Sequence, residues 1–343
     1  MAVEQDCRKQ VVIANDSNRR DQARQIAENL SKDKQVLAVV GHYTSPNTCA
    51  ALNVYSDNNL VVIAPTSTMV NLPSNQNCGG DPNKVFFRTV SSTRVEAQTL
   101  IGYLVNDLKQ TQPRVVAFYN PNELFSNDMF EQFEQVLTSY GGELIAAFDL
   151  SDPKLQADQL PPQVSQADAI AILPDGGTDS DTALQKAVDF IKLNDGDKPI
   201  LGANTLYLQK VINEGQDTLV DRLFIAVDWH PQQCGAETFS QQVREYWGGD
   251  LNRRTALAYE ALQVIVSKLP AAPASKVTRG YIRQKLSETG ITEGAAPQSD
   301  VLAGQTISFD ARGDRREITT RAIVTVNDQL RFALAKDDNC PGI

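Results

Sequence analysis

Short runs rich in valine and isoleucine alternate along this chain with segments in which apolar residues recur at helical spacing. The first helical segment places Ala23, Ile26, Ala27 and Leu30 on one face. Strands that alternate with helices build parallel sheets covered by helices, so the pattern predicts an α/β fold. In the first part of the chain, strands are predicted at residues 11–14, 36–40, 61–64, 85–89, 115–119 and 144–148. We expect the first of these strands to be buried.

The length of 343 residues exceeds what one core usually serves, so two lobes are expected. The remaining strands are predicted at residues 169–173, 200–203, 223–227, 306–309, 321–326 and 330–334. Helices are predicted at residues 23–30, 47–58, 97–108, 127–140, 154–164, 179–193 and 206–214. Residues 239–289 are expected to be mainly helical, with an interruption at the sequence PAAPAS.

The charge and hydropathy of the chain exclude two classes of partner. Its formal net charge is −10 and its runs of Lys and Arg stop at two, which argues against nucleic acid, because phosphate binding needs clustered positive charge. No window approaches the roughly 20 consecutive apolar residues of a membrane helix, so membrane insertion is not expected. The opening sequence MAVEQDCRKQ has neither the basic nor the apolar region of a signal peptide.

Five cysteines lie far apart, without the Cys and His spacing of a metal site, so no metal is expected. Cys78 and Cys340 lie in polar, loop-like sequence where a disulfide can form in an oxidising compartment. Unpaired thiols are the alternative.

Catalytic chemistry finds little support in the sequence. The chain has only two histidines, His42 and His230, and neither segment reads as a paired nucleophile and base. The sequence also lacks the motifs of serine hydrolases, phosphate-binding loops, zinc helices and dinucleotide-binding turns. We therefore expect no catalytic residue, no cofactor and no enzymatic activity.

Two predicted strands change abruptly from apolar to hydroxyl-rich sequence at their ends, in VVGHYTSP (39–46) and VIAPTST (62–68). In open parallel sheets, ligands bind beyond the carboxyl ends of the strands. There, backbone N–H groups and hydroxyls can receive a carboxylate. The pattern predicts a small anion site, and the alternative is that these residues only cap helices and form turns.

These blocks resemble the type I solute-binding proteins represented by the branched-chain amino-acid-binding proteins of bacterial ABC importers. The resemblance covers most of the chain, and the two hydroxyl-rich blocks and the FDxxGD block are its specific parts. In chain order, the similar blocks are VVIANDSN (11–18), AVVGHYTSPNT (38–48), VVIAPTSTMVNL (61–72), FFRTVSST (86–93), AYEALQVI (258–265) and ISFDARGDRR (307–316).

The resemblance implies a ligand-binding cleft at the hydroxyl-rich strand ends. In that family, residues at the positions of Ser45 and Thr68 hold the α-carboxylate of the ligand. Backbone at the position of Thr66 helps to receive the ammonium group. The other residues expected on or next to this wall are Tyr43, Thr44 and Ser67.

Across the cleft the chain departs from the family. Phe125 falls where the family usually has a tyrosine or similar ring, and Ser126 replaces the glycine that follows. Family members place a tyrosine near Asp175 and an acidic residue near Asn204. If Asp175 faces the cleft, it can neutralise the ammonium group instead, and a plain turn residue is the alternative. Arg254, near a position that contacts the ligand side chain, suits an acidic or polar ligand, against the alternative of a solvated arginine at a helix start.

The largest departure lies at the N-terminus. The family begins with a strand and a helix that precede the segment matching residues 10–18, and they have no counterpart after Met1. Because that strand lies inside the lobe 1 sheet in the family, its loss exposes sheet edges and apolar surface. A truncated or degraded family member is expected, and the same cause accounts for the lack of a signal peptide.

The resemblance implies two Rossmann-like lobes with parallel sheets, the first strand of lobe 1 missing, joined by three crossovers near Ser91, His230 and Thr319. Lobe 1 is expected at residues 1–91 and 231–318, and lobe 2 at 92–230 and 319–343. A ligand bound between the lobes favours the closed form through its differential contacts.

The function implied is that of a periplasmic or extracellular protein that traps a small amino-acid-like ligand and presents it to an ABC permease. A sensor module with the same fold, which regulates a kinase or chemoreceptor partner, is the alternative, and the sequence does not separate the two.

Overall fold

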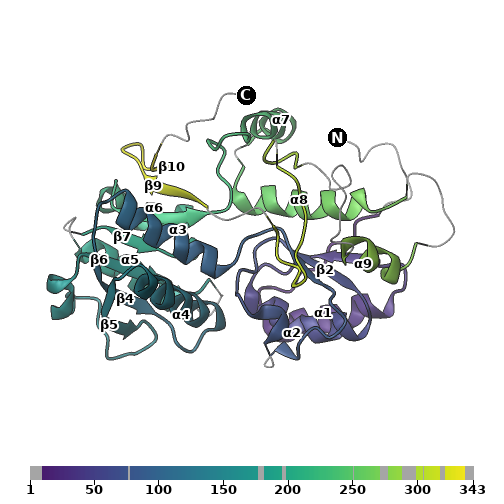
Figure 1. The fold of residues 1–343 in the computed structure, drawn as a ribbon, viewed down its shortest axis with the longest axis horizontal. Helices are drawn as coiled ribbons and strands as arrows, with labels where there is room; N and C mark the ends of the chain where they lie inside the picture. Colours follow the sequence, from purple (N-terminus) through teal and green to yellow (C-terminus); the bar gives the residue numbers. More distant parts are fainter. Residues whose placement is uncertain are drawn as a thin grey trace.

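Two α/β units, each built on its own sheet, lie side by side in the computed structural model of the chain (Figure 1). The model describes residues 10–75, 78–176, 181–194, 198–249, 251–270, 277–287, 299–303, 305–316 and 321–336. The α/β class with mostly parallel sheets is the one predicted from the sequence.

The first sheet has the parallel order β1-β2-β3. Its strands are β1 (Ala38–Val40), β2 (Val61–Ala64) and β3 (Phe86–Arg88). The helices of this unit are α1 (Arg20–Lys32), α2 (Ser45–Asp57), α8 (Arg253–Ser267) and α9 (Arg279–Ser287). Because side chains alternate along a strand, β2 turns Val62 and Ala64 toward α2 but Val61 and Ile63 toward α8 and α9. Helices therefore cover both faces, which is why all four residues of β2 are buried.

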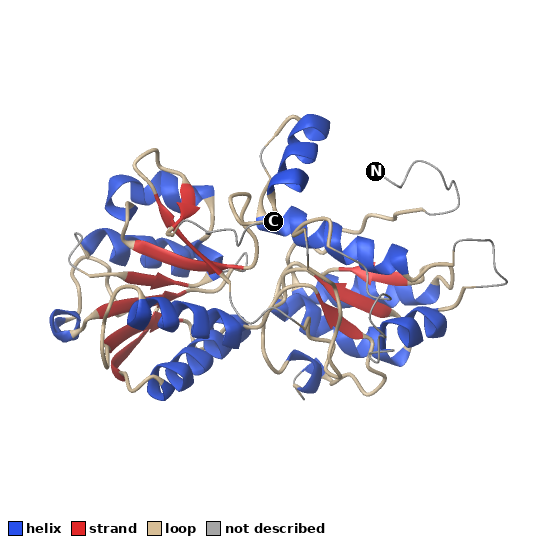
Figure 2. Ribbon diagram, turned by 45° about the horizontal axis from the view of Figure 1, so that its top comes forward, coloured by secondary structure: helices blue, strands red, loops and turns tan. Residues whose placement is uncertain are grey.

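The second sheet has seven strands in the order β10-β9-β8-β7-β6-β4-β5. These strands are β4 (Arg114–Tyr119), β5 (Glu143–Asp149), β6 (Ala169–Leu173), β7 (Ile200–Gly202), β8 (Leu223–Val227), β9 (Ala322–Val326) and β10 (Phe332–Leu334). The helices of this unit are α3 (Thr93–Asn106), α4 (Leu124–Ser139), α5 (Asp181–Leu193) and α6 (Gln209–Gly215). Strands β4 to β8 run parallel, and β9 and β10 add an antiparallel edge (Figure 2). No described helix is both long and apolar enough to cross a membrane.

The predicted strand at residues 11–14 is wrong. This segment belongs to no strand, and its side chains of Val11, Val12 and Ile13 are 67%, 65% and 92% exposed. In the described residues β1 pairs only with β2, so no strand lies where this segment could donate its backbone hydrogen bonds. An apolar run becomes a strand only where a neighbouring strand completes the ladder.

Two further predictions fail at the level of local structure. Residues 154–164, predicted as a helix, form turns that lead into a 3-10 helix, Pro162–Gln166. Pro161 and Pro162 interrupt the helical hydrogen bonds there. The predicted strand at 306–309 contains only isolated bridge residues, among them Phe309, which pairs with Arg315 in an antiparallel bridge.

The chain passes between the units in three places. It leaves the first sheet after β3, returns after β8 to form α7 (Glu237–Trp247), α8 and α9, and enters the second sheet again at β9. In Figure 1, α7 lies above α8, and Phe239 of α7 packs near the buried Trp229 that follows β8.

One buried arginine ties these passages together. The Arg321 guanidinium donates to the Glu96 carboxylate at 2.8 Å and to the Ser91 hydroxyl at 2.7 Å, and its Nε lies 3.3 Å from Asp228. Ser91 follows β3, Asp228 follows β8, and Arg321 precedes β9. All three passages therefore share one charged cluster, which we call the hinge cluster: Ser91, Glu96, Asp228 and Arg321.

His230, in the second passage, is expected to make stability fall in acid. Burial lowers the pKa of His230 to about 4, against the opposing effect of the Phe332 carbonyl. Between pH 6.5 and 4 the unfolded chain binds a proton at this residue that the folded chain does not, so the free energy of unfolding falls as pH falls. From pH 7 to pH 4.5 we expect a loss of about 2–3 kcal/mol from this residue alone.

Urea denaturation of the wild type and of His230→Gln at both pH values measures this effect. Other groups titrate equally in both proteins, so the difference between the two profiles isolates His230. Parallel profiles would rule out a neutral buried histidine.

Candidate functional site

A cleft of about 660 Å³ lies between the two units. From the unit of the first sheet it is lined by Asn18, Arg19, Arg20, Asp21, Tyr43, Thr44, Ser45, Pro46, Asn47, Thr66, Arg253 and Arg254. From the unit of the second sheet it is lined by Glu123, Phe125, Asp175, Gly176, Asn204, Thr205 and Leu208. Strands β1, β2, β4, β6 and β7 all point their carboxyl ends at it, which is where parallel sheets bind ligands.

Ser45 opens α2 at the wall formed by the first sheet. Its side-chain oxygen accepts hydrogen bonds from the backbone N–H groups of Thr68 and Met69, at 3.1 and 3.3 Å. The hydroxyl thus joins the loop after β1 to the loop after β2. A hydroxyl that accepts two hydrogen bonds still has its own proton to donate, so Ser45 can serve the cleft as a donor.

The loops after β1 and β2 are also bonded directly to each other. The Thr66 hydroxyl donates to the Tyr43 carbonyl at 2.6 Å, and the Thr44 hydroxyl donates to the Asn18 side chain at 3.2 Å. Tyr43, Thr44, Ser45 and Thr66 therefore form one continuous polar wall.

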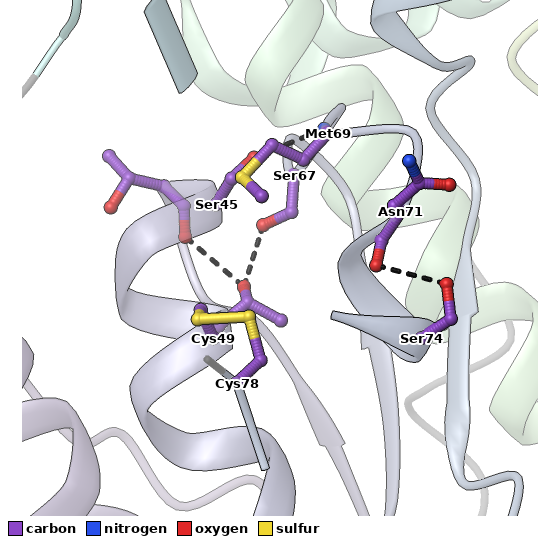
Figure 3. The surroundings of a disulfide bond; sticks show 9 residues. Ser45, Cys49, Ser67, Met69, Asn71, Ser74 and Cys78 are labelled. Carbon is purple, nitrogen blue, oxygen red and sulfur yellow. Dashed lines mark hydrogen bonds between the residues drawn. A yellow bond between two sulfur atoms is a disulfide. The ribbon is translucent and has the colours of Figure 1, made fainter. Parts of the chain in front are cut away.

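Ser67 and Thr68, also predicted as ligand-binding, do not line the cleft. Both are buried, and the Ser67 hydroxyl lies 2.6 Å from that of Thr48. A disulfide lies behind this loop and joins Cys49 of α2 to Cys78 (Figure 3). Cys78 does form a disulfide, but with a helical cysteine, and Cys340 lies outside the described residues.

On the wall formed by the second sheet, Phe125 lines the cleft and packs into the core beneath it. Ser126, where the resemblance implied a glycine, joins two strand ends. Its hydroxyl accepts the Asn120 N–H at 2.7 Å and donates to the Leu173 carbonyl at 2.5 Å. The carboxyl ends of β4 and β6 are thereby held together beside the cleft.

Asp175 and Asn204 both line the cleft and are both 4% exposed. The Asp175 carboxylate accepts a hydrogen bond from the Asn120 side chain at 3.0 Å. Asn204 is engaged on two sides: its amide nitrogen donates to Glu96 at 2.6 Å, and its side-chain oxygen accepts from Arg253 at 2.5 Å. Of the two, Asp175 presents the negative charge, and Asn204 links the cleft to the hinge cluster.

Sequence reasoning missed two contributions to the cleft. Arg253 is a buried cation at its floor, and it donates to the side chain of Asn204, 49 positions away. Arg20 and Glu123 form an ion pair of 2.6 Å between α1 and the residue before α4, which joins the two units beside the cleft. For Arg253 the sequence did carry a signal, because two arginines occupy the first turn of α8, where the helix dipole disfavours positive charge.

Among the described residues, no group of three or more His, Cys, Asp or Glu is placed to hold a metal ion.

The sequence profile of a family described as periplasmic binding protein matches residues 8–329 of this chain. The solved structure of the branched-chain amino acid transporter substrate-binding protein LivJ from Streptococcus pneumoniae, in complex with isoleucine, is 18% identical with a TM-score of 0.73. That match covers 94% of this chain and 85% of LivJ.

Two other solved structures share the fold. An ABC transporter substrate-binding protein from Desulfitobacterium hafniense, complexed with Leu, is 21% identical with a TM-score of 0.72, over 94% of this chain and 87% of the other. A solute-binding protein of an ABC transporter from Rhodopseudomonas palustris, in complex with 3,4-dihydroxybenzoic acid, is 14% identical with a TM-score of 0.70, over 93% and 81%. No curated protein sequence matches the chain significantly.

Proposed function

This chain belongs to the periplasmic binding protein family, and on that premise we propose that it captures a small amino-acid-like solute for an ABC importer. The observation that carries the proposal is the cleft between the two units, which offers the Ser45 hydroxyl as a donor on one wall and a buried carboxylate on the other. An α-amino acid has the matching pair of charges. The neighbouring structures with isoleucine and leucine support this class of ligand.

The carboxylate of the solute is proposed to lie against the wall formed by the first sheet. Ser45 is proposed to donate to it, Tyr43 and Thr44 complete the wall, and the backbone of Thr66 is proposed to help receive the ammonium group. Ser67 and Thr68 are proposed to act from behind, because their loop supplies the backbone groups that orient Ser45.

The ammonium group is proposed to lie near Asp175. A buried carboxylate held by Asn120 favours a cation beside it, since the low dielectric strengthens the attraction. Phe125 supplies apolar surface on the same wall, and Asn204 acts through its bonds to Glu96 and Arg253.

Closure is proposed to involve two lobes, with residues 1–91 and 231–318 in the first and 92–230 and 319–343 in the second. The ligand is released chemically unchanged, and an ABC permease binds the closed form of the protein. An extracytoplasmic location is supported by the Cys49–Cys78 disulfide, because such bonds persist in oxidising compartments.

Amino acids are expected to raise the melting temperature of the protein. A ligand at 100 times its Kd stabilises the folded state by about 2.7 kcal/mol. Asp175→Asn keeps the shape of the side chain but removes its charge, so affinity is expected to fall about 10- to 100-fold. Thermal shift across a panel of amino acids, amides and carboxylates, followed by calorimetric titration, measures both effects.

Asp158→Asn is the matched control, because Asp158 is exposed between β5 and β6 and does not line the cleft. Mass spectrometry of the released solute tests whether it is unchanged. A panel without any binder, or a converted solute, would refute the proposal.

A further inference from the structure

Two adjacent arginines, Arg253 and Arg254, open α8 at the floor of the cleft. The N-terminus of a helix carries a partial positive charge, so two cations in the first turn are unfavourable there, and α8 has no acidic residue in that turn to offset them. Because this arginine pair is unfavourable for the helix itself, its presence indicates that the arginines serve the function of the site.

The other cleft cations already have carboxylate partners. Arg19 pairs with Asp21 at 2.8 Å, and Arg20 pairs with Glu123 at 2.6 Å. Arg254 differs: its guanidinium lies 4.8 Å from the centre of the Tyr43 ring, and no carboxylate of the described residues is within salt-bridge distance. Its positive charge therefore lies over the hydroxyl wall without a neutralising carboxylate among the described residues.

Arg253 lies beneath, and its hydrogen bonds are incomplete. Its Nη2 donates to Asn204, but Nε and Nη1 are buried without a hydrogen-bond acceptor among the described residues. Nη1 lies 3.9 Å from Asp228, whose other oxygen faces Arg321. Buried donors without an acceptor are costly, and Arg253 thus adds a positive charge at the floor of the cleft that is offset by Asp228 only across 3.9 Å.

The lining of the cleft lacks the strong negative charge of the whole protein, whose net charge is −10. Four arginines and three acidic residues line it, and Arg253 also lies 3.9 Å from Asp228 behind the lining, so Arg254 is the lining arginine without a carboxylate within salt-bridge distance among the described residues. A concave site with low-dielectric walls concentrates the field of such a charge and attracts solutes of opposite charge.

We infer that the solute carries a second carboxylate, as acidic amino acids do, and that Arg254 binds it with Arg253 as the supporting charge. This inference rests on the proposed function and specifies its ligand. The α-carboxylate takes the hydroxyl wall, the ammonium group lies near Asp175, and the second carboxylate meets the planar guanidinium of Arg254, whose fork suits a bidentate pair. An aliphatic side chain would instead cover Arg254 without giving its charge a partner.

Calorimetric titration with paired amino acids tests this inference. Glutamate and aspartate are expected to bind at least tenfold more tightly than glutamine and asparagine, which have nearly the same shape without the charge. Arg254→Gln is expected to abolish this preference, with little change for the amides, and Arg254→Lys is expected to restore part of it. Arg114→Gln, at the start of β4 and outside the cleft, is the control.

The comparison of acids with amides on the wild type needs no variant and stands whatever Arg254→Gln does to folding. Amides or aliphatic amino acids that bind as well as the acids would overturn the inference and leave the proposed function intact. The same holds if Arg254→Gln leaves the preference unchanged. Failure of every amino acid to bind the folded protein would overturn the proposed function, and the inference with it.

Discussion

Replacing Arg321 with methionine is expected to lower the free energy of unfolding by about 3–5 kcal/mol. The side chains of Arg321, Glu96 and Asp228 are all fully buried, and Arg321 is the cation that contacts both carboxylates directly. Methionine fills much of the space but leaves two buried negative charges, and among the described residues the cation that remains near them is Arg253, 3.9 Å from Asp228. The loss arises from those uncompensated charges rather than from the worth of the intact pair.

Urea denaturation followed by tryptophan fluorescence measures this effect, because Trp229 is buried in the second passage between the units. Arg321→Lys keeps the charge but has fewer donors, so an intermediate loss is expected. Adding Glu96→Gln to Arg321→Met is expected to recover part of the stability, since one buried charge disappears. Arg24→Met, on an exposed arginine of α1, serves as the control and is expected to change stability by less than about 0.5 kcal/mol. A loss below 1 kcal/mol for Arg321→Met would contradict the hinge cluster.

Strands were predictable where both faces of a sheet are covered. Residues 61–64, 169–173 and 223–227 were predicted to the residue, and all three strands are wholly buried. A continuous apolar run is the signature of such strands. Residues 11–14 have the same composition but lack a neighbouring strand in the described structure. Composition shows that a segment can form a strand, but it does not show whether a neighbouring strand is present to pair with it.

The residues of the cleft also differ in whether the sequence could predict them. Its hydroxyl wall could be predicted, because Tyr43, Thr44 and Ser45 follow one strand and Thr66 follows the next. The burial of Arg253 could not be predicted, since its hydrogen-bond partner Asn204 lies in the second unit. A long charged side chain is exposed by default, and only a tertiary contact reverses that expectation.

The disulfide is a further case in which tertiary contact decided the outcome. Cys49 lies in a predicted helix and Cys78 in a predicted loop, and their Cα atoms are 4.5 Å apart. The bond fastens the segment after β2 to α2, whose first residue is Ser45. It therefore ties the chain that follows the hydroxyl wall to the helix that begins at Ser45.

Replacing both Cys49 and Cys78 with alanine is expected to cost about 3–4 kcal/mol of stability. The cross-link spans 29 residues, and opening a loop of that length returns this much chain entropy to the unfolded state. Substitution is a sharper test than a reductant, because Cys234 is also disulfide-bonded and would be reduced as well. Ser74→Ala alters an exposed residue inside the same loop without opening it, so denaturation of that variant should match the wild type. If the double alanine variant also unfolds at the wild-type urea concentration, the bond does not restrain the unfolded chain, and the non-covalent contacts of Ser45 with Thr68 and Met69 hold the loop by themselves.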